Sequence, residues 1–124
     1  MTEEIKRLSQ LIKQSQHIVF FGGAGVSTES QIPDFRSDDG LYGDKQAKRY
    51  PYPPETMLSH SFFEQHTKEF FEYYFDKMVY PDAKPNPAHI ALAKLEQMGK
   101  LSAVITQNID GLHQMAGSKR VCEL

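Results

Sequence analysis

Three short segments contain the residues of this chain that could do chemistry. The first is a glycine turn after an apolar run, formed by Gly22, Gly23, Ala24 and Gly25, with Thr28 three residues further on. A glycine turn lets backbone N–H groups approach a phosphate, and the start of a following helix favours its negative charge. The pattern is common and lacks the third glycine of the dinucleotide fingerprint. Alone it indicates a candidate nucleotide site, with a tight turn that binds no ligand as the alternative.

The second segment follows the glycine turn directly and combines an acid, a ring and a base. These are Asp34, Phe35 and Arg36, preceded by Pro33. A guanidinium presents a planar fork of donors that suits an anion. The alternative for an acid and a base so close together in a loop is a surface ion pair.

The third segment closes a second apolar run and carries Gln107, Asn108, Ile109 and Asp110. Amide and carboxylate side chains after a strand can bind a ligand, and they can also cap the next helix. Asp110 is placed to cap a short helix through Met115 that ends at Gly117. The two roles can coexist. His113 follows in the same segment and is expected to be structural.

The elements around these segments alternate between helical and strand patterns. An amphipathic helix is predicted at residues 2–16, with Thr2 as its N-cap. A second helix is predicted to begin at Asn86 and Pro87 and to end at Gly99. Apolar runs at 17–21, 102–106 and 120–124 indicate buried strands. Because such an alternation favours right-handed strand–helix–strand units, the sequence predicts an α/β fold with a parallel sheet.

The middle of the chain has a different character. Residues 31–56 contain turn formers and prolines and are expected to form a long irregular segment, which in a compact domain usually has a function. Residues 60–80 are dense in aromatic side chains and are predicted to be helical. The rings are expected to pack a small helical module; the alternative is that one or two of them line a peptide or acyl groove.

Composition bounds the possibilities further. The 124 residues fit one small domain, and a net charge of −2 gives no basic field for nucleic acid. Apolar runs of about six residues are too short to cross a bilayer, and the acidic N-terminus does not resemble a signal peptide. A single cysteine, Cys122, cannot form an internal disulfide or supply a zinc tetrad. No metal site, no nucleic-acid partner, no membrane association and a cytoplasmic location are therefore expected.

The three segments, in this order, resemble the sirtuins, the NAD-dependent protein-lysine deacylases, and their bacterial members most closely. The resemblance extends from about residue 17 to residue 124. It implies a partial Rossmann-like parallel sheet flanked by helices, with a small helical module inserted. Residues 1–124 would be the N-terminal portion of the NAD-binding domain, with the cofactor loop and helical module at 31–80. The zinc-ribbon, the C-terminal half and the general-base histidine of the family would lie beyond residue 124.

The resemblance also implies a role for each segment. NAD would lie across the carboxyl ends of the strands, with the glycine turn at the pyrophosphate and Thr28 adding a hydroxyl. Asp34 would begin the flexible cofactor loop, Phe35 would shield the reacting ribose carbon from water, and Arg36 would lie near the phosphates. The cofactor-binding residues implied so far are Gly22, Gly23, Ala24, Gly25, Thr28, Asp34, Phe35 and Arg36.

The third segment matches the nicotinamide pocket of the family. A carboxamide has a donor and an acceptor, so an aspartate beside backbone N–H groups can bind both. Asn108 would hold a ribose hydroxyl or a water near the reacting carbon. The resemblance thus implies Gln107, Asn108, Ile109 and Asp110 as cofactor-binding residues, and Asn108 and Asp110 as catalytic residues.

The implied reaction moves an acyl group from lysine to ADP-ribose and releases nicotinamide. NAD is the implied cofactor, zinc is expected only in full-length members, and an acetylated-lysine protein or peptide is the implied substrate. The 124-residue chain is expected to be inactive alone and to self-associate through its open sheet. Two alternatives remain: a non-catalytic module that binds NAD, ADP-ribose or a protein, and an ADP-ribosyltransferase.

Two positions depart from the family pattern. Gln31 stands where the family usually has glycine; if that position needs a positive φ, a side chain there costs roughly 1 kcal/mol. The cofactor loop also lacks the Tyr-x-x-Arg pair of the succinyl- and malonyl-preferring members, and the nearest approach is Tyr42 to Lys45. An acetyl group is therefore the expected acyl group.

Overall fold

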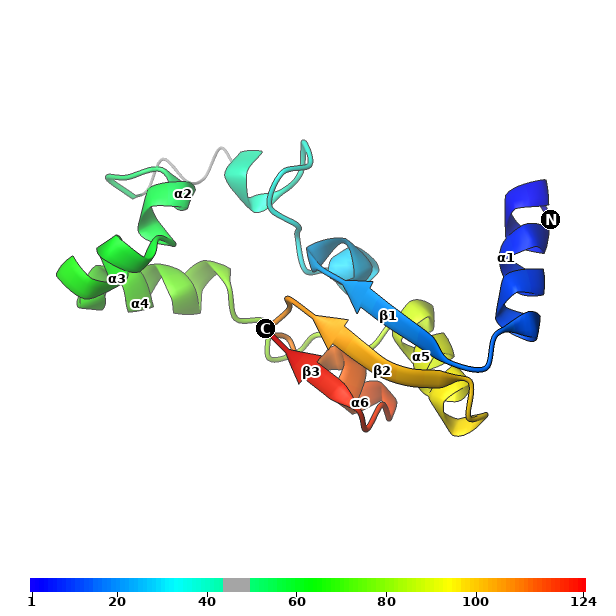
Figure 1. The fold of residues 1–124 in the computed structure, drawn as a ribbon. Coiled ribbons are helices and arrows are strands. Elements are labelled where there is room, and N and C mark those ends of the chain that lie inside the picture. The colour runs from blue at the N-terminus through cyan, green and yellow to red at the C-terminus, as the bar shows by residue number, and fades with distance from the viewer. Residues whose placement is uncertain (44–49) are drawn as a thin grey trace.

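The computed structural model describes residues 1–43 and 50–124 of the chain. A parallel three-stranded sheet lies between helix α1 and a group of short helices (Figure 1). The strand order is β1-β2-β3. The strands are β1 (Ile18–Gly22), β2 (Leu101–Thr106) and β3 (Val121–Glu123). The predicted α/β fold with a parallel sheet is confirmed, and each strand begins within one residue of its predicted position.

The helices before and between the strands are mostly short. In the described residues the α-helices are α1 (Glu3–Gln14), α2 (Pro54–Met57), α3 (His60–Gln65), α4 (Thr67–Lys77), α5 (Pro87–Gln97) and α6 (Leu112–Ala116), and the 3₁₀-helices are η1 (Ala24–Ser30) and η2 (Leu41–Gly43). The glycine turn thus leads into a 3₁₀-helix. None of the helices in the described part of the chain has the length and apolarity that crossing a membrane requires.

Helix α5 begins with a capping box formed by Asn86 and His89, and the Asn86 side chain also bonds to η1. The Asn86 side chain accepts the Ala88 N–H at 2.9 Å, and Nδ1 of His89 accepts the Asn86 N–H at 3.1 Å. The Asn86 Nδ2 donates to the Val26 carbonyl at 2.8 Å and to the Ser30 hydroxyl at 3.1 Å. The predicted N-cap is confirmed, and through it residue 86 lies against the end of η1.

Other predicted helix ends are also confirmed. The Thr2 hydroxyl accepts the Ile5 N–H at the start of α1. Gly99, at φ 74°, follows α5, and Gly117, at φ 109°, ends α6. Positive φ angles of this kind are where glycine is favoured, because it has no Cβ to clash with the following carbonyl.

One face of the sheet packs against α5 and α6. Phe20 of β1 contacts the ring of His113 on α6, with the ring centroids 6.0 Å apart. Val104 of β2 is completely buried, and Leu112 of α6 is nearly so. These side chains form the core beneath the carboxyl ends of the strands. His113 is a core residue, as the sequence predicts.

The helical module has a core of its own. Leu41, Met57, Phe62 and Tyr73 are buried together, from η2, α2, α3 and α4. The helix predicted within 60–80 is interrupted at His66, where α3 ends and α4 begins. The packing interpretation of the aromatic residues is confirmed for the rings in this core.

Gln31 ends η1 in the left-handed conformation, with φ 65° and ψ 25°. It is the one non-glycine residue with positive φ in the described part of the chain. The condition stated for this departure from the family pattern, a positive φ, is therefore met. Of the pair at Tyr42 and Lys45, Lys45 lies outside the described residues, and Tyr42 packs against Phe35 with ring centroids 5.4 Å apart.

Candidate functional site

The first and third segments meet at the carboxyl ends of β1 and β2. The Gln107 N–H donates to the Gly22 carbonyl at 3.1 Å, which extends the pairing of the two strands by one step. The Asn108 Nδ2 donates to the Gly23 carbonyl at 3.0 Å. A Cβ on Gly23 would meet the Gln107 side chain at 2.9 Å, so the glycine allows the two segments to approach closely. Parallel sheets place ligands at this end.

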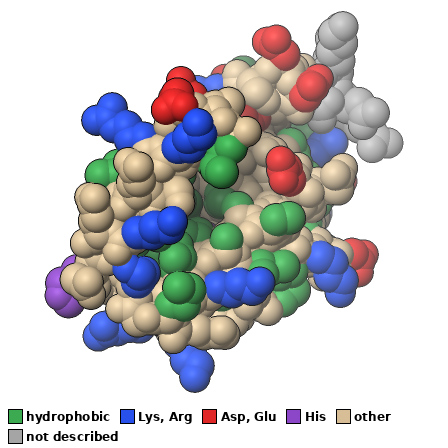
Figure 2. Space-filling model, turned by 90° about the vertical axis from the view of Figure 1, so that its right-hand side faces the viewer, with side chains coloured by type: hydrophobic (Ala, Val, Ile, Leu, Met, Phe, Trp, Pro, Cys, Tyr) green, Lys and Arg blue, Asp and Glu red, His purple; other side chains and the backbone are tan. Residues whose placement is uncertain are grey.

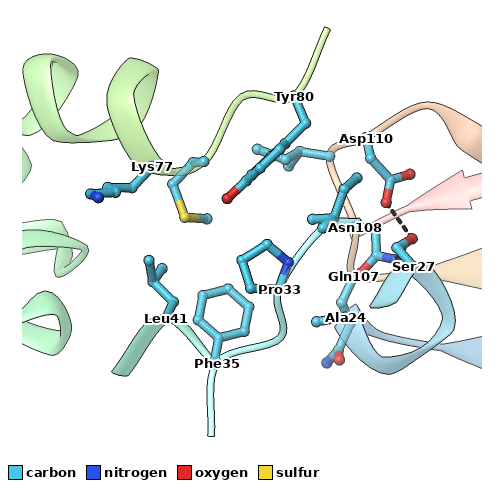
Figure 3. A pocket seen from close by; sticks show the side chains of 13 residues that line it. Ala24, Ser27, Pro33, Phe35, Leu41, Lys77, Tyr80, Gln107, Asn108 and Asp110 are labelled. Carbon is cyan, nitrogen blue, oxygen red and sulfur yellow. Dashed lines mark hydrogen bonds between the residues drawn. The ribbon is translucent and has the colours of Figure 1, made fainter. Parts of the chain in front are cut away.

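A buried serine hydroxyl joins the side chains of the third segment. Ser27 is 1% exposed and lies in η1. Its hydroxyl donates to Oδ2 of Asp110 at 2.6 Å and accepts from Nδ2 of Asn108 at 3.2 Å. Figure 3 shows the bond between Ser27 and Asp110 at the edge of the pocket. The two predicted catalytic residues are thus held by a shared partner.

Asp110 is held on its second oxygen as well. Its Oδ1 accepts the Leu112 N–H at 3.0 Å, at the start of α6. Asp110 thus bonds the first N–H of α6 as predicted, although the N-cap position itself is occupied by Gly111. Because a carboxylate oxygen has two lone pairs, each oxygen of Asp110 keeps the capacity to accept another hydrogen bond.

His89 approaches the same serine from α5. Its Nε2 lies 3.5 Å from the Ser27 hydroxyl, and its Nδ1 accepts a backbone N–H, so the neutral ring carries its proton on Nε2. Burial, and then the neighbouring His113, lower the pKa of His89; burial also lowers the pKa of His113. The rings pack edge to face, with centroids 4.8 Å apart. Both imidazoles are therefore neutral at pH 7, and His89 presents an N–H to the serine.

An apolar cavity of about 90 Å³ opens beside this network. It is bounded by the third segment, the start of η1, the loop containing Pro33 and Phe35, and the chain after α4 (Figure 3). Asn108 and Asp110 line it, and Tyr80 and Leu41 come from the helical module. The cavity therefore has an apolar wall on one side and amide and carboxylate groups on the other.

A more open cavity of about 260 Å³ shares part of this lining. It adds Gly25, Asp34 and Arg36, and it has Phe35 in common with the apolar cavity. A Cβ on Gly25 would meet nothing within 4 Å, so free space borders the glycine turn. An apolar recess with hydrogen-bonding groups, followed by a glycine turn and a guanidinium, fits a flat amide ring joined to a diphosphate.

The alternative for the second segment, a surface ion pair between Asp34 and Arg36, is not among the ion pairs of the described residues. The Asp34 carboxylate accepts the backbone N–H of Ser37 at 3.3 Å and also the Ser37 hydroxyl. The Arg36 guanidinium lies 6.0 Å from the centroid of the Tyr42 ring. Arg36 is exposed at the open cavity, where it can meet an anion.

The structure does not bring every predicted residue to these cavities. The Thr28 hydroxyl donates to the Gly25 carbonyl at 3.0 Å, and the exposed side chain lines a separate hollow beside Asp34 rather than either of these cavities. Gly22 lies within β1, opposite Thr106. The structure also adds Ser27 and His89, which the sequence analysis did not select. Their partners are 62 and 83 residues away along the chain, so short motifs gave no direct signal for them.

A family model and two closely similar curated proteins point to the same family. The model of the Sir2 family matches residues 23–124. The chain is 60% identical over all 124 residues to the NAD-dependent protein deacetylase of Clostridium acetobutylicum, of which it covers 50%. It is 67% identical over 119 residues, 96% of this chain, to the NAD-dependent protein deacetylase of Clostridium tetani, of which it covers 47%.

Solved structures agree. A Sir2 variant with a deacetylated p53 peptide and 3′-O-acetyl ADP-ribose has a TM-score of 0.83 at 45% identity, covering 97% of this chain and 46% of that one. A Sir2 bound to an acetylated peptide has a TM-score of 0.79 at 41% identity, covering 100% of this chain and 45% of that one. The chain spans about half the length of the relatives it matches. It belongs to the Sir2 family.

Proposed function

We propose that this chain forms the NAD site of an NAD-dependent protein-lysine deacetylase, which moves an acetyl group from lysine to ADP-ribose and releases nicotinamide. Residues 1–124 would be the N-terminal portion of its NAD-binding domain. The observation that carries the proposal is the convergence of Asn108 and Asp110 on Ser27 beside the apolar cavity. The names of the relatives, and the ADP-ribose and acetylated peptides in the neighbouring structures, support it.

Asp110 would bind the carboxamide of the nicotinamide. Ser27 and the Leu112 N–H fix the orientation of the carboxylate, and its remaining lone pairs can accept the carboxamide N–H. A carboxylate held on both oxygens loses little freedom when it binds a ligand, which favours a preorganised site.

Asn108 would hold a ribose hydroxyl or a water. Its Nδ2 hydrogens are directed at the Gly23 carbonyl and the Ser27 hydroxyl, which leaves Oδ1 as the acceptor that the side chain can offer to a ligand. The same contacts would keep this acceptor beside the reacting carbon.

The remaining groups would exclude water and bind the phosphates. Phe35 lines both cavities, so its ring can exclude water from them. Gly25 and Arg36 border the open cavity, where backbone N–H groups and a guanidinium suit the diphosphate. NAD, when bound, supplies the electrophilic ribose carbon and the nicotinamide leaving group. The resemblance places the general base beyond residue 124.

The test uses a protein as long as the relatives, made by joining this chain to the remaining half of the Clostridium acetobutylicum deacetylase. Two substitutions are then introduced into it. Asn108→Ala and Asp110→Ala should each lower deacetylation of an acetyl-lysine peptide by at least about tenfold, because each removes a preorganised hydrogen bond at the reacting centre. Asp82→Ala, in an exposed loop, is the matched control and should retain full turnover. Thermal melts show whether each variant is folded.

Near-normal kinetics in both site variants would contradict the proposed pocket. Cleavage of NAD with transfer of ADP-ribose to a protein would favour the ADP-ribosyltransferase alternative. Saturable ADP-ribose binding without turnover by the joined protein would favour a binding module.

A further inference from the structure

The second of the three segments belongs to a loop that closes on its own start. The Leu41 N–H donates to the Asp34 carbonyl at 2.6 Å, and the Tyr42 N–H donates to the Phe35 carbonyl at 2.9 Å. Gly40 is buried, and a Cβ there would meet the Asp34 carbonyl oxygen at 2.9 Å, a separation that real Cβ atoms do not reach. Backbone hydrogen bonds and a close approach at a glycine thus close this loop.

The loop is attached to the core of the helical module. Leu41 is 5% exposed and belongs to that core, and the half-buried rings of Phe35 and Tyr42 pack against it. Figure 3 shows Phe35 and Leu41 on the same side of the apolar cavity. The position of Phe35 at the cavity therefore depends on how residues 41 and 42 are packed.

The Tyr42 ring lies beside two side chains that the proposed site uses. Its centroid is 5.4 Å from that of Phe35, with the rings tilted by 56°, a separation typical of attractive aromatic pairs. The Arg36 guanidinium carbon is 6.0 Å from the same centroid, at the outer limit of a cation–π contact. One ring therefore lies against both the side chain proposed to exclude water and the side chain proposed to meet the phosphates.

The guanidinium lies against this ring although carboxylates are near it in the sequence. The loop contains Asp34, Asp38 and Asp39 besides Arg36. Figure 2 shows acidic side chains along the upper part of the surface, the end at which Figure 1 places this loop. None of the ion pairs among the described residues includes Arg36. A guanidinium that lies against a ring, rather than in an ion pair, keeps its N–H donors for an anion.

We propose that Tyr42 is a positioning residue of the NAD site: its ring holds Phe35 at the apolar cavity and Arg36 at the open cavity. One side chain then sets both the group that excludes water and the group that binds phosphate. The inference rests on the proposed function, and Tyr42 itself lines neither cavity. Loss of its ring should therefore change binding and reaction only through Phe35 and Arg36.

Trypsin tests the loop in the 124-residue chain. It cleaves after Arg36, and cleavage requires local opening of the loop. Tyr42→Leu removes the ring and should raise the rate of this cleavage at least about fivefold, the factor that an aromatic pair is worth, whereas Tyr42→Phe should leave the rate unchanged. Tyr52→Leu is the matched control. Tyr52 also packs on a ring of the module core, that of Phe62, with centroids 5.3 Å apart, and its exchange should not affect cleavage after residue 36.

ADP-ribose is the probe for Arg36. In the joined protein described above, Tyr42→Leu should weaken ADP-ribose binding about threefold to fivefold, measured by isothermal titration calorimetry. In an Arg36→Ala background the same exchange should lose most of this effect, because the ring would then have no guanidinium to hold.

The products of the reaction test Phe35. If Phe35 is no longer held, water can add to the reacting ribose carbon as its bond to nicotinamide breaks, which gives ADP-ribose. Tyr42→Leu should therefore release more nicotinamide per acetyl group removed, and in a Phe35→Ala background it should not raise this ratio further. Gly40→Ala should open the loop without removing a side chain from the module core, and it should reproduce both effects. The test thus stays decisive if Tyr42→Leu unfolds the module.

Three results would overturn the proposal: unchanged cleavage after residue 36 in both Tyr42→Leu and Gly40→Ala, equal damage by Tyr42→Phe and Tyr42→Leu, and a full effect on ADP-ribose binding without Arg36. Thermal melts show whether each variant is folded. The cleavage measurement needs neither NAD nor turnover, so failure of the proposed deacetylase activity would leave it intact. Normal behaviour of the Tyr42 variants would in turn leave the test of Asn108 and Asp110 unaffected.

Discussion

At the scale of single residues, the site depends on one hydroxyl that three distant parts of the chain share. The Ser27 hydroxyl accepts a hydrogen bond from Asn108, donates one to Asp110 and faces the N–H of His89. A hydroxyl has one donor and two acceptor lone pairs, and these three contacts use all of them. The orientation of the amide and the carboxylate thus depends on a side chain that itself has no capacity left for a ligand.

Replacing Gln31 by glycine should stabilise the fold. The left-handed conformation at φ 65° is unfavourable for a residue with a Cβ, so Gln31→Gly is expected to raise the free energy of unfolding by roughly 1 kcal/mol. Gln31→Asn should give a smaller gain, because asparagine tolerates this conformation better than glutamine. Chemical denaturation measures both. Gln97→Gly, in helical conformation at the end of α5, is the control and should not stabilise; an equal gain there would contradict the argument.

The buried histidine pair should make stability depend on pH. In the unfolded chain both rings titrate near their ordinary pKa of 6.5, whereas burial lowers the pKa of His89 and His113 in the folded chain. Protons therefore bind the unfolded chain preferentially, so that stability is fully present above pH 6.5 and falls as the pH decreases from there towards the lower folded pKa.

Thermal melts between pH 5 and 8 measure this dependence. His113→Phe, which removes one titrating ring and keeps an aromatic side chain beside Phe20, should make the decline shallower. His60→Phe, at an exposed position of α3, should leave the decline unchanged. Equal slopes in all three proteins would show that the buried pair is not its source.

The residue-scale predictions succeeded where the physical cause is local. The caps at Thr2 and Asn86 and the positive φ at Gln31 depend on neighbours within a few positions, and the sequence contains those neighbours. Ser27 and His89 were missed because their role depends on contacts across more than 60 residues. A serine after a glycine turn and a histidine in the first turn of a helix have no local pattern that reveals such a contact.

At the scale of elements, α1 is the least secured helix of the described chain. It has no buried residue, and a 12-residue helix is marginal in water without tertiary support. The Lys100 ammonium donates to the carbonyls of Ile12, Lys13 and Ser15 at 3.2, 3.0 and 3.1 Å. A cation at the carboxyl end of a helix also interacts favourably with its dipole.

Lys100→Met should therefore release α1 from the sheet while the rest of the fold persists. Amide hydrogen exchange in residues 3–14 is expected to accelerate by at least about tenfold, because a charge-assisted contact is worth more than one neutral hydrogen bond. Exchange in β2 should change little. Lys94→Met, at an exposed position of α5, is the matched control; faster exchange of α1 in that variant would point to a general loss of stability.

The three strands and helices α1, α5 and α6 were predictable from the sequence because apolar periodicity and turn residues mark them, whereas η2 and the start of α2 lie in the segment that was expected to be irregular. The interruption at His66 and the 3₁₀ form of η1 were not predictable either, since both depend on how the module and the third segment pack around them. Local sequence patterns also could not predict which face of the sheet the helices cover. The covered face follows from the direction of the connections, which only the strand order reveals.

At the scale of the whole molecule, the face of the sheet opposite α5 and α6 should determine how the chain behaves alone. Val19 and Phe21 are exposed on a parallel sheet whose β1 and β3 edges have no neighbouring strand in the described residues, which favours self-association and binding of a hydrophobic dye. The double variant Val19→Thr, Phe21→Thr is expected to reduce dye fluorescence at least about twofold at equal protein concentration. Met98→Thr is the control for a single exposed side chain elsewhere. A monodisperse monomer that binds no dye would show that the face is covered in solution.

The 124-residue chain alone should not deacetylate an acetyl-lysine peptide above background. It spans about half the length of the relatives that bear the enzyme's name, and loss of a general base alone lowers turnover on the order of 10²–10⁴-fold. Nicotinamide release that tracks deacetylation by this chain would falsify the expectation. The activity of the joined protein described above is the positive control.

The cap of α5 has a consequence for the segment that precedes it. Because the Asn86 amide lies within a hydrogen bond of the Ser30 hydroxyl, at 3.1 Å, the segment 31–85 leaves the sheet domain and returns to it at one point. An insertion with coincident ends can change in length at little entropic cost, since the closure term grows only slowly with the number of residues. Residues 31–85 therefore form an insertion that can be exchanged as one unit. Evolution or an engineer could exchange it between relatives, and with it the wall of the apolar cavity that holds Leu41 and Tyr80, while the strands and the Ser27 network stay as they are.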